Sequence, residues 1–355
     1  MNDSSTLQKN GLQLGMIIGR SRIFGDARDM ALETIEHVCK TCHRFKIVLA
    51  AKNDPIHGIL RERNIPTAVL PDAFCAPLAK TRQFAMTPEY EAWENEIRTH
   101  NLDLGITFYS GWLPISLVAV PRLRFINIHP APLPMLTGYE AEKFHVITDR
   151  RRSWGVIHRL EEHFDTGNIL TEGLPVNLPE DMTPMDVYEG LIGGCIPKLL
   201  ELLDQFAAGD TPSEKNQDES QRTYASRKNA FQETVIRWHH DTHRQIDCRF
   251  RAFNTVEDEM ILKAKIDDQL YSILDLMLDV GDFPGVPGQR IGRYHQNGLF
   301  DNTPIVRTLQ GIAVLRLGQP ITSHDQPVYL APEDIKPRRA ASKKVERNCL
   351  ILDEN

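Results

Sequence analysis

An amide and an imidazole stand two residues apart at the end of an apolar run, Phe-Ile-Asn-Ile-His, at residues 125–129. If this run is a β-strand, Asn127 and His129 emerge on the same face and can converge on one small volume. An amide donates hydrogen bonds without changing its charge, and an imidazole can give or take a proton near neutral pH. The pair suits nucleophilic attack on a carbonyl carbon, where an oxyanion grows and a proton must leave.

Two further features could complete such a site. The three prolines within residues 130–134 fix φ and lack a backbone donor, so they favour a loop of fixed shape beside the pair. Further along, Asp165 precedes Thr166 and Gly167, a turn signature between two strand-like runs. Its carboxylate could orient the imidazole or a water, as the third member of a catalytic group does. It could equally only cap the turn, and both interpretations stay open.

The elements that would position these residues alternate between strand-like and helix-like runs. Strands are predicted at residues 12–19, 45–52, 67–71, 102–110 and 124–129, and helices at 27–42, 56–64, 88–101 and 114–120. This alternation predicts a Rossmann-like α/β fold, with a mostly parallel sheet covered on both faces. Ligands of such sheets bind at the carboxyl ends of the strands. Two more strands, within 154–162 and 167–178, and a long helix at 183–209 follow.

The remainder of the chain has a different character. Short β-like runs at 260–266, 303–309 and 311–318 are broken by a Gly/Pro-rich stretch at 281–289, a pattern typical of a small OB-like β-barrel. We therefore predict a Rossmann-like catalytic domain at 1–209, a polar linker at 210–222, a C-terminal OB-like domain at 223–330 and a polar tail at 331–355.

Composition excludes several other classes of protein. The 355 residues carry a formal net charge of −7, which argues against general affinity for nucleic acid or anionic membranes. No apolar run reaches the roughly 18 residues of a membrane span, and the polar start has no signal-like segment, so we expect a cytoplasmic protein. The Cys-Lys-Thr-Cys-His run at 39–43 has the spacing of a c-type haem attachment site. It ends a helical run without an export signal, so we predict neither haem nor a metal.

With these residues in view, the chain resembles the formyltransferases that use 10-formyltetrahydrofolate. The resemblance is carried by Asn-Ile-His-Pro-Ala-Pro-Leu-Pro-Met-Leu-Thr-Gly at 127–138 and by Glu-Glu-His-Phe-Asp-Thr-Gly at 161–167. It extends over about residues 12–208, and weakly into 223–238 and 251–254, which look like the start of the small β-barrel of longer members. The resemblance implies that an amine attacks the formyl carbon of 10-formyltetrahydrofolate and that tetrahydrofolate leaves. Asn127 would hold the formyl oxygen, His129 would stabilise the oxyanion or move the proton, and ionised Asp165 would orient His129 or a water.

The resemblance also implies binding residues. The pterin ring would lie against the backbone of two segments, represented by Trp112, Leu113, Pro114, Glu161, Glu162 and His163. Arg20 and Tyr139 are weaker candidates for substrate contacts. Where the family often has a basic residue just before the loop glycine, this chain has Thr137, which puts a substrate contact from that position in doubt.

Several functions share these motifs. We expect an N-formyltransferase acting on a small amine, such as a nucleotide-linked amino sugar or a natural-product intermediate. Neither nucleic acid nor membrane is expected as a partner, and we leave room for a homodimer. A methionyl-tRNA formyltransferase and a formyltetrahydrofolate hydrolase are the alternatives. A regulatory protein on an inactive scaffold is disfavoured, because all three catalytic positions are filled.

Overall fold

The computed structural model describes residues 11–19, 27–75, 78–109, 111–254, 260–296, 300–321 and 345–353. It divides the chain into two compact units. The first comprises Met1–Ala141, Arg152–Leu178 and Tyr188–Ala225, and the second comprises Glu142–Arg151, Pro179–Val187 and Ser226–Asn355.

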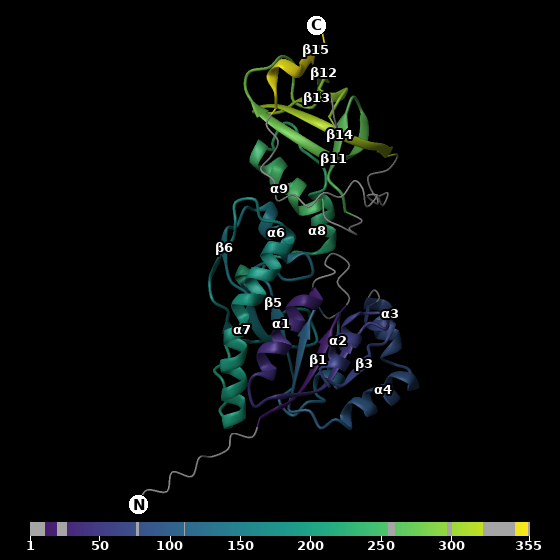
Figure 1. The fold of residues 1–355 in the computed structure, drawn as a ribbon, viewed down its shortest axis with the longest axis vertical. Helices are drawn as coiled ribbons and strands as arrows, with labels where there is room; N and C mark the ends of the chain where they lie inside the picture. The colour runs from purple at the N-terminus through teal and green to yellow at the C-terminus, as the bar shows by residue number, and fades with distance from the viewer. Residues whose placement is uncertain are drawn as a thin grey trace, which may run out of the picture. The chain divides into compact units, whose positions relative to one another are not determined.

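The first unit is built on a seven-stranded sheet with the order β3-β2-β1-β4-β5-β7-β8. Its strands are β1 (Gln13–Ile18), β2 (Arg44–Ala50), β3 (Thr67–Val69), β4 (Leu104–Phe108), β5 (Phe125–His129), β7 (Val156–Arg159) and β8 (Ile169–Glu172). The first five strands are parallel, whereas β7 and β8 pair antiparallel to their neighbours. The predicted Rossmann-like, mostly parallel sheet is confirmed (Figure 1).

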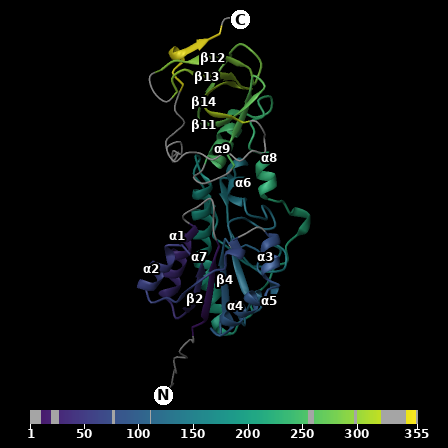
Figure 2. The same cartoon turned by 90° about the vertical axis from the view of Figure 1, so that its right-hand side faces the viewer.

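Apolar side chains cover both faces of this sheet, because alternate residues of each strand point to opposite sides. Leu14, Met16 and Ile18 of β1 join one core, whereas Ile17 joins the other. The first core includes α1 (Ala27–Cys39), α2 (Ile56–Glu62) and α7 (Pro184–Ala208). The second includes α3 (Leu78–Phe84), α4 (Pro88–Arg98) and α5 (Ile115–Val118), and Figure 2 shows these helices on the side of the sheet away from α1.

Short elements complete the first unit. They are η1 (Asp72–Cys75), β6 (Arg152–Ser153), β9 (Val176–Asn177) and η2 (Glu219–Gln221), and β6 pairs antiparallel with β9. The helix α6 (Ala141–Ile147) follows β5 along the chain and belongs to the second unit from Glu142 onward. The long helix predicted at 183–209 is confirmed as α7, which has 25 residues and contains Pro197.

The second unit holds a six-stranded antiparallel sheet with the order β10-β11-β14-β13-β12-β15. Its elements are α8 (Arg227–Gln232), α9 (His243–Phe253), β10 (Lys263–Ile266), β11 (Gln269–Val280), β12 (Arg290–Tyr294), β13 (Thr303–Arg307), β14 (Gly311–Ile321), η4 (Arg347–Cys349) and β15 (Leu350–Leu352). Met277, Tyr294 and Val314 belong to its apolar core. The prediction of a small, barrel-like C-terminal β domain is confirmed (Figure 1).

The segment interpreted as a linker, residues 210–222, makes ordered contacts within the first unit. The amide of Lys215 donates to the carbonyl of Ile169 at 2.9 Å, and the amide of Ile169 donates back at the same distance. The boundaries at 209 and 223 stay a prediction. Among the helices in the described part of the chain, none combines the length and the apolar character needed to cross a membrane.

Candidate active site

The carboxyl-terminal half of β5 carries Asn127 and His129. The strand lies between β4 and β7, with Asn127 opposite Thr107 on one side and opposite His158 on the other. Phe125, Ile126 and Ile128 are buried in the cores, and this burial fixes the strand's register so that the two polar side chains share a face. His129 is buried and Asn127 is half-buried.

Hydrogen bonds from both neighbouring strands fix the Asn127 amide. The Thr107 hydroxyl donates to Oδ1 of Asn127 at 2.7 Å, and Nδ2 of Asn127 lies 3.1 Å from Nε2 of His158. An amide nitrogen has two hydrogens, so one remains for a ligand. The amide is therefore held in one orientation with a donor left for a ligand, as an oxyanion stabiliser requires.

The tautomer of His158 follows from its partners. Nδ1 lies 2.8 Å from the carbonyl oxygen of Arg159, which can only accept, so Nδ1 carries the hydrogen and Nε2 accepts from Asn127. The ring is fully buried, and burial lowers the pKa of His158 to about 4, although Asp165 nearby opposes this shift. His158 is thus a neutral acceptor that orients Asn127.

Asp165 lies where both histidines meet. Its Oδ2 lies 3.7 Å from Nδ1 of His129, and its Oδ1 lies 3.6 Å from Nε2 of His158. The amide of Gly138 donates to Oδ2 of Asp165 at 2.9 Å. Nε2 of His129 lies 3.1 Å from the carbonyl oxygen of Leu136, so this nitrogen carries a hydrogen.

Backbone geometry in two loops creates these contacts. Asp165 has a φ of 54°, Leu136 a φ of 58° and Gly138 a φ of 114°. The left-handed region is accessible to Asp and Gly but unfavourable for Leu, so surrounding contacts must hold the 130–138 loop in this conformation. The result is that a carbonyl and an amide of this loop point at the histidine and the carboxylate respectively.

The low pKa of His158 has a consequence for stability. Its value of about 4 in the folded protein, against 6.5 for an ordinary histidine, means that the folded state binds fewer protons than the unfolded state between these pH values. We expect the free energy of unfolding to fall by up to about 3 kcal/mol as the pH drops through this range. Urea denaturation at a series of pH values should show a shallower fall in His158→Gln than in the wild type. His239→Gln provides a control, because His239 is exposed. An equal pH dependence of the unfolding free energy in the wild type and both variants would contradict the low pKa of His158.

The structure brings together the two segments expected to bind folate. Nε1 of Trp112 donates to the carbonyl oxygen of Glu162 at 2.9 Å, and the Arg82 guanidinium lies 5.4 Å from the Trp112 ring centroid. Leu113 and Pro114 are buried, whereas Glu161, Glu162 and His163 are exposed. This places a partly exposed indole beside the exposed loop that leads to Asp165. The binding role of these residues stays a prediction.

Of the two residues expected to contact the substrate, Tyr139 and Arg20, the structure describes only Tyr139. Tyr139 is 44% exposed and forms an aromatic pair with Phe164, which is 37% exposed, with ring centroids 5.7 Å apart. Tyr139 directly follows Gly138, and Phe164 directly precedes Asp165. The two rings therefore lie next to the candidate catalytic residues. Arg20 lies outside the described residues.

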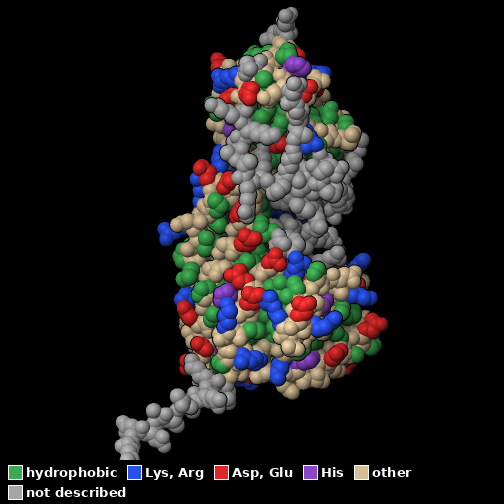
Figure 3. All heavy atoms as spheres, viewed as in Figure 1, with side chains coloured by type: hydrophobic (Ala, Val, Ile, Leu, Met, Phe, Trp, Pro, Cys, Tyr) green, Lys and Arg blue, Asp and Glu red, His purple; other side chains and the backbone are tan. Residues whose placement is uncertain are grey.

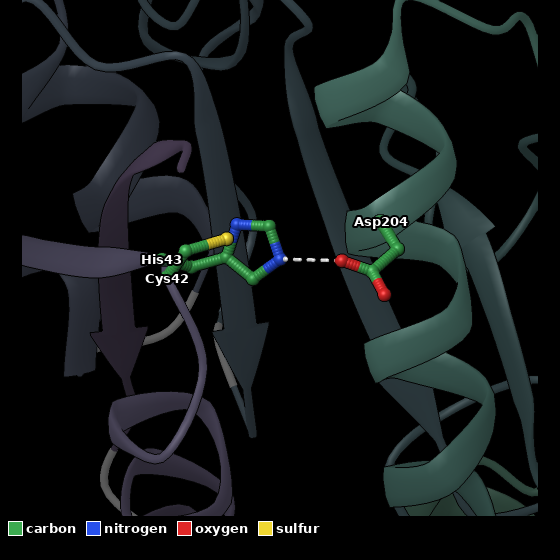
Figure 4. Close-up of side chains that lie close together, drawn as sticks. All are labelled: Cys42, His43 and Asp204. Atoms are coloured by element: carbon green, nitrogen blue, oxygen red, sulfur yellow. Dashed lines mark ion pairs between the residues drawn. The ribbon is translucent and has the colours of Figure 1, made fainter. Parts of the chain in front are cut away.

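A second cluster of potential ligands lies at the start of β2. Cys42, His43 and Asp204 have donor atoms within 4.8 Å of one another, and Figure 4 shows the His43 ring directed at Asp204 of α7. The Leu12 amide donates to Nδ1 of His43 at 3.1 Å, so the hydrogen is on Nε2, which lies 3.5 Å from Asp204. When a histidine binds a metal through one ring nitrogen, the other nitrogen normally carries a hydrogen and donates it. If Nε2 of His43 bound a metal, Nδ1 could not do this, because Nδ1 accepts from the Leu12 amide. We interpret the cluster as a contact that joins β1, β2 and α7.

Sequence reasoning missed several residues of the site. His158 and Thr107 hold Asn127, and Gln217 contacts the turn that carries Asp165. A signal was present for His158, because a histidine that follows the apolar residues Val156 and Ile157 in a buried strand needs a specific partner. No local signal marks Gln217, which lies 52 positions from Asp165 in a polar stretch.

The fold and the site define a Rossmann-like domain with Asn127 and His129 in the carboxyl-terminal part of β5 and Asp165 in the loop between β7 and β8. Residues 35–189 match the family model described as formyl transferase. Over these residues the chain is similar to formyl transferases. A methionyl-tRNA formyltransferase from Coxiella burnetii is 27% identical over 246 residues, which cover 65% of this chain and 72% of the relative. One from Lachnospira eligens is 31% identical over 203 residues, 57% of this chain and 62% of the relative.

Solved structures share the fold. HypX from Aquifex aeolicus, in complex with tetrahydrofolic acid, has a TM-score of 0.54 at 14% identity, over 86% of this chain and 43% of that chain. This protein thus spans less than half of HypX. An N-formyltransferase from Helicobacter canadensis, in complex with folinic acid and dTDP-3-aminofucose, has a TM-score of 0.53 at 15% identity, over 86% of this chain and 100% of that one.

Proposed function

We propose that this protein is an N-formyltransferase that moves the formyl group of 10-formyltetrahydrofolate to a primary amine of a small molecule. The amine nitrogen attacks the formyl carbon, and the bond from that carbon to N10 of the folate then breaks. The amine loses a proton and tetrahydrofolate gains one as it leaves. The acceptor is a nucleotide-linked amino sugar or an amine of a natural-product pathway.

One observation carries the proposal: Nδ1 of His129 lies 3.7 Å from Asp165, and His158 contacts both Asn127 and Asp165, although Asp165 comes from a distant segment. The free Nδ2 hydrogen of Asn127 stabilises the oxyanion of the tetrahedral intermediate. His129 exchanges the proton of the attacking amine, and Asp165 orients the imidazole. Formyl transfer requires these groups and no redox chemistry.

The pterin ring of the folate would lie against the two segments that the hydrogen bond from Trp112 to Glu162 joins. A flat heterocycle rich in donors and acceptors can be recognised by backbone groups of the kind this loop and Leu113 offer. The tetrahydrofolic acid of the HypX complex and the folinic acid of the Helicobacter canadensis complex support a folate donor for this fold.

Charge distribution supports a small acceptor. A tRNA enzyme must contact several phosphates, mostly through Lys and Arg. The connection from β2 to β3 carries a balanced set of charges: Lys52, Asp54, Arg61, Glu62 and Arg63. Arg63 is also paired with Glu36 at 2.7 Å. Among the described side chains on the face in Figure 3, Lys and Arg are interspersed with Asp and Glu, without a basic stripe.

The methionyl-tRNA formyltransferases among its relatives support tRNA as the second candidate acceptor. The aromatic pair Tyr139 and Phe164 favours the small acceptor, since exposed rings next to the catalytic residues can stack on the base or sugar of a nucleotide.

The acceptor is tested by offering the protein 10-formyltetrahydrofolate with amino sugar nucleotides in some reactions and with charged initiator tRNA in another. We expect mass spectrometry to detect a formylated sugar nucleotide and no formyl-methionyl-tRNA. Formylation of tRNA at an ordinary enzymatic rate would establish the second candidate instead. Release of formate that does not depend on any acceptor would indicate a hydrolase.

A further inference from the structure

Residues 214–225, here called the strap, return to the candidate active site and cross both of its loops. The Thr137 amide donates to the Thr223 carbonyl at 2.9 Å, and the Ala225 amide donates to the Thr137 carbonyl at 2.8 Å. The Leu136 amide donates to the Thr223 hydroxyl at 2.9 Å. The strap therefore binds the loop that supplies the Leu136 carbonyl to His129.

The side chain of Gln217 binds the other loop. Its Nε2 donates to the carbonyl oxygens of Asp165 and Gly167, at 2.8 and 2.7 Å. Both hydrogens of this amide are thus used on the turn that carries the candidate catalytic carboxylate. Asp165 has a φ of 54° there, a conformation that needs support from outside the turn.

Arg222 joins the two loops. Its side chain is only 4% exposed, and its guanidinium donates to Oε1 of Gln217 at 3.1 Å and to the Thr137 hydroxyl at 2.7 Å. The Thr137 hydroxyl in turn donates to the Pro134 carbonyl at 3.0 Å. A continuous chain of hydrogen bonds therefore runs from the Asp165 turn, through Gln217, Arg222 and Thr137, into the proline-rich loop.

Arg222 has one further partner that is not part of this series of hydrogen bonds. Glu219 forms an ion pair with the Arg222 guanidinium. The guanidinium also lies within hydrogen-bonding reach of the Asp165 carbonyl, at 3.5 Å. The strap thus brings a buried cation to the side chain of Thr137, next to Gly138. Because the cation is covered and fully bonded, it can hold the loops but cannot reach an acceptor.

We propose that Gln217 and Arg222 are positioning residues for formyl transfer. They fix the Asp165 turn relative to the Leu136 carbonyl and the Gly138 amide, and thereby set the distance between Asp165 and His129. This inference rests on the proposed function, because it assigns the two residues to the same catalytic group. A displacement of about 1 Å in such a group can cost about 10²-fold in rate.

The test uses Gln217→Glu in the full-length protein, which keeps the shape of the side chain and replaces the two donors with an acceptor. We expect kcat for formyl transfer to fall about 10- to 100-fold in a protein that remains folded, with the KM for 10-formyltetrahydrofolate nearly unchanged and with a displaced pH–rate profile. Arg222→Lys should retain more activity than Arg222→Met, because a lysine keeps the charge and part of the hydrogen bonding. Gln221→Ala is the matched control, since the Gln221 side chain lies in the same strap, is exposed, and donates to Asp218 alone in the described contacts.

A kcat of Gln217→Glu within about twofold of the wild type, or an equal loss in Gln221→Ala, would overturn the inference. A second readout needs no acceptor: the NMR signals of the His129 ring should move in Gln217→Glu and stay in place in Gln221→Ala. If the wild type transfers no formyl group to any acceptor, the proposed function fails, and unchanged His129 signals in Gln217→Glu would still refute the positioning role. If Gln217→Glu does not fold, Gln217→Ala is measured in the same way.

Discussion

Replacing His129 by alanine, Asn127 by alanine or Asp165 by asparagine is expected to reduce formyl transfer by about 10²- to 10⁴-fold. Each substitution removes a group that acts in the transition state: the proton carrier, the oxyanion donor or the carboxylate that orients the ring. The effect should appear in kcat, because the proposed folate contacts of Trp112 and Glu162 are untouched. Steady-state kinetics with the identified acceptor measure the loss in kcat. Calorimetric titration of the folate shows whether folate binding is retained.

Stability must be followed in the same variants. Asn127→Ala removes the donor to Nε2 of His158 and leaves the Thr107 hydroxyl with the Ile126 carbonyl at 3.3 Å, which costs on the order of 1–3 kcal/mol. This cost is too small to explain a large loss of rate if the protein remains folded. His240→Ala is the control, since His240 is exposed and lies outside the proposed site. Near-normal turnover in His129→Ala would show that the catalytic assignment is wrong.

Gly167→Ala is expected to cause the second large effect, on folding as well as on activity. A Cβ at this position would lie 2.0 Å from the carbonyl oxygen of Arg159 and 2.7 Å from its carbonyl carbon. Both atoms belong to the backbone of β7, so neither can move without displacing the strand next to His158. We expect a loss of about 3 kcal/mol or more in the free energy of unfolding, and a loss of activity because the turn that carries Asp165 must shift.

Gly58→Ala provides the matched glycine control. A Cβ there would meet no heavy atom within 4 Å, and the residue lies inside α2. Alanine is the better helix former, so this change should be neutral or should stabilise the protein by up to about 1 kcal/mol. Thermal and urea denaturation of both variants decide the point. A wild-type melting temperature in Gly167→Ala would mean that the close approach of the turn to β7 is absent.

The parallel sheet could be predicted because its signals are local. β1 and β4 are short apolar runs, and α1 and α4 have apolar residues at helical spacing. The order of residue types therefore predicts that helices bury both faces of the sheet. The long α7 was equally clear, since its apolar positions recur over 25 residues. The polar stretch at 210–222 predicts a linker for the same local reason, although Lys215 pairs with Ile169. Composition shows that a segment is polar, but not what its backbone binds.

The sequence by itself determined the class of fold and the residue types of the candidate site. Asn127 and His129 were placed on one face by the two-residue period of a strand, and Asp165 was marked by its turn signature. Only the tertiary structure decided which groups surround them. The acceptor of Asn127 is His158, the donor to Asp165 is Gly138, and Gln217 supports the turn from 52 positions away. Such contacts depend on strand pairing and loop closure between distant segments, and no local pattern of residue types specifies them.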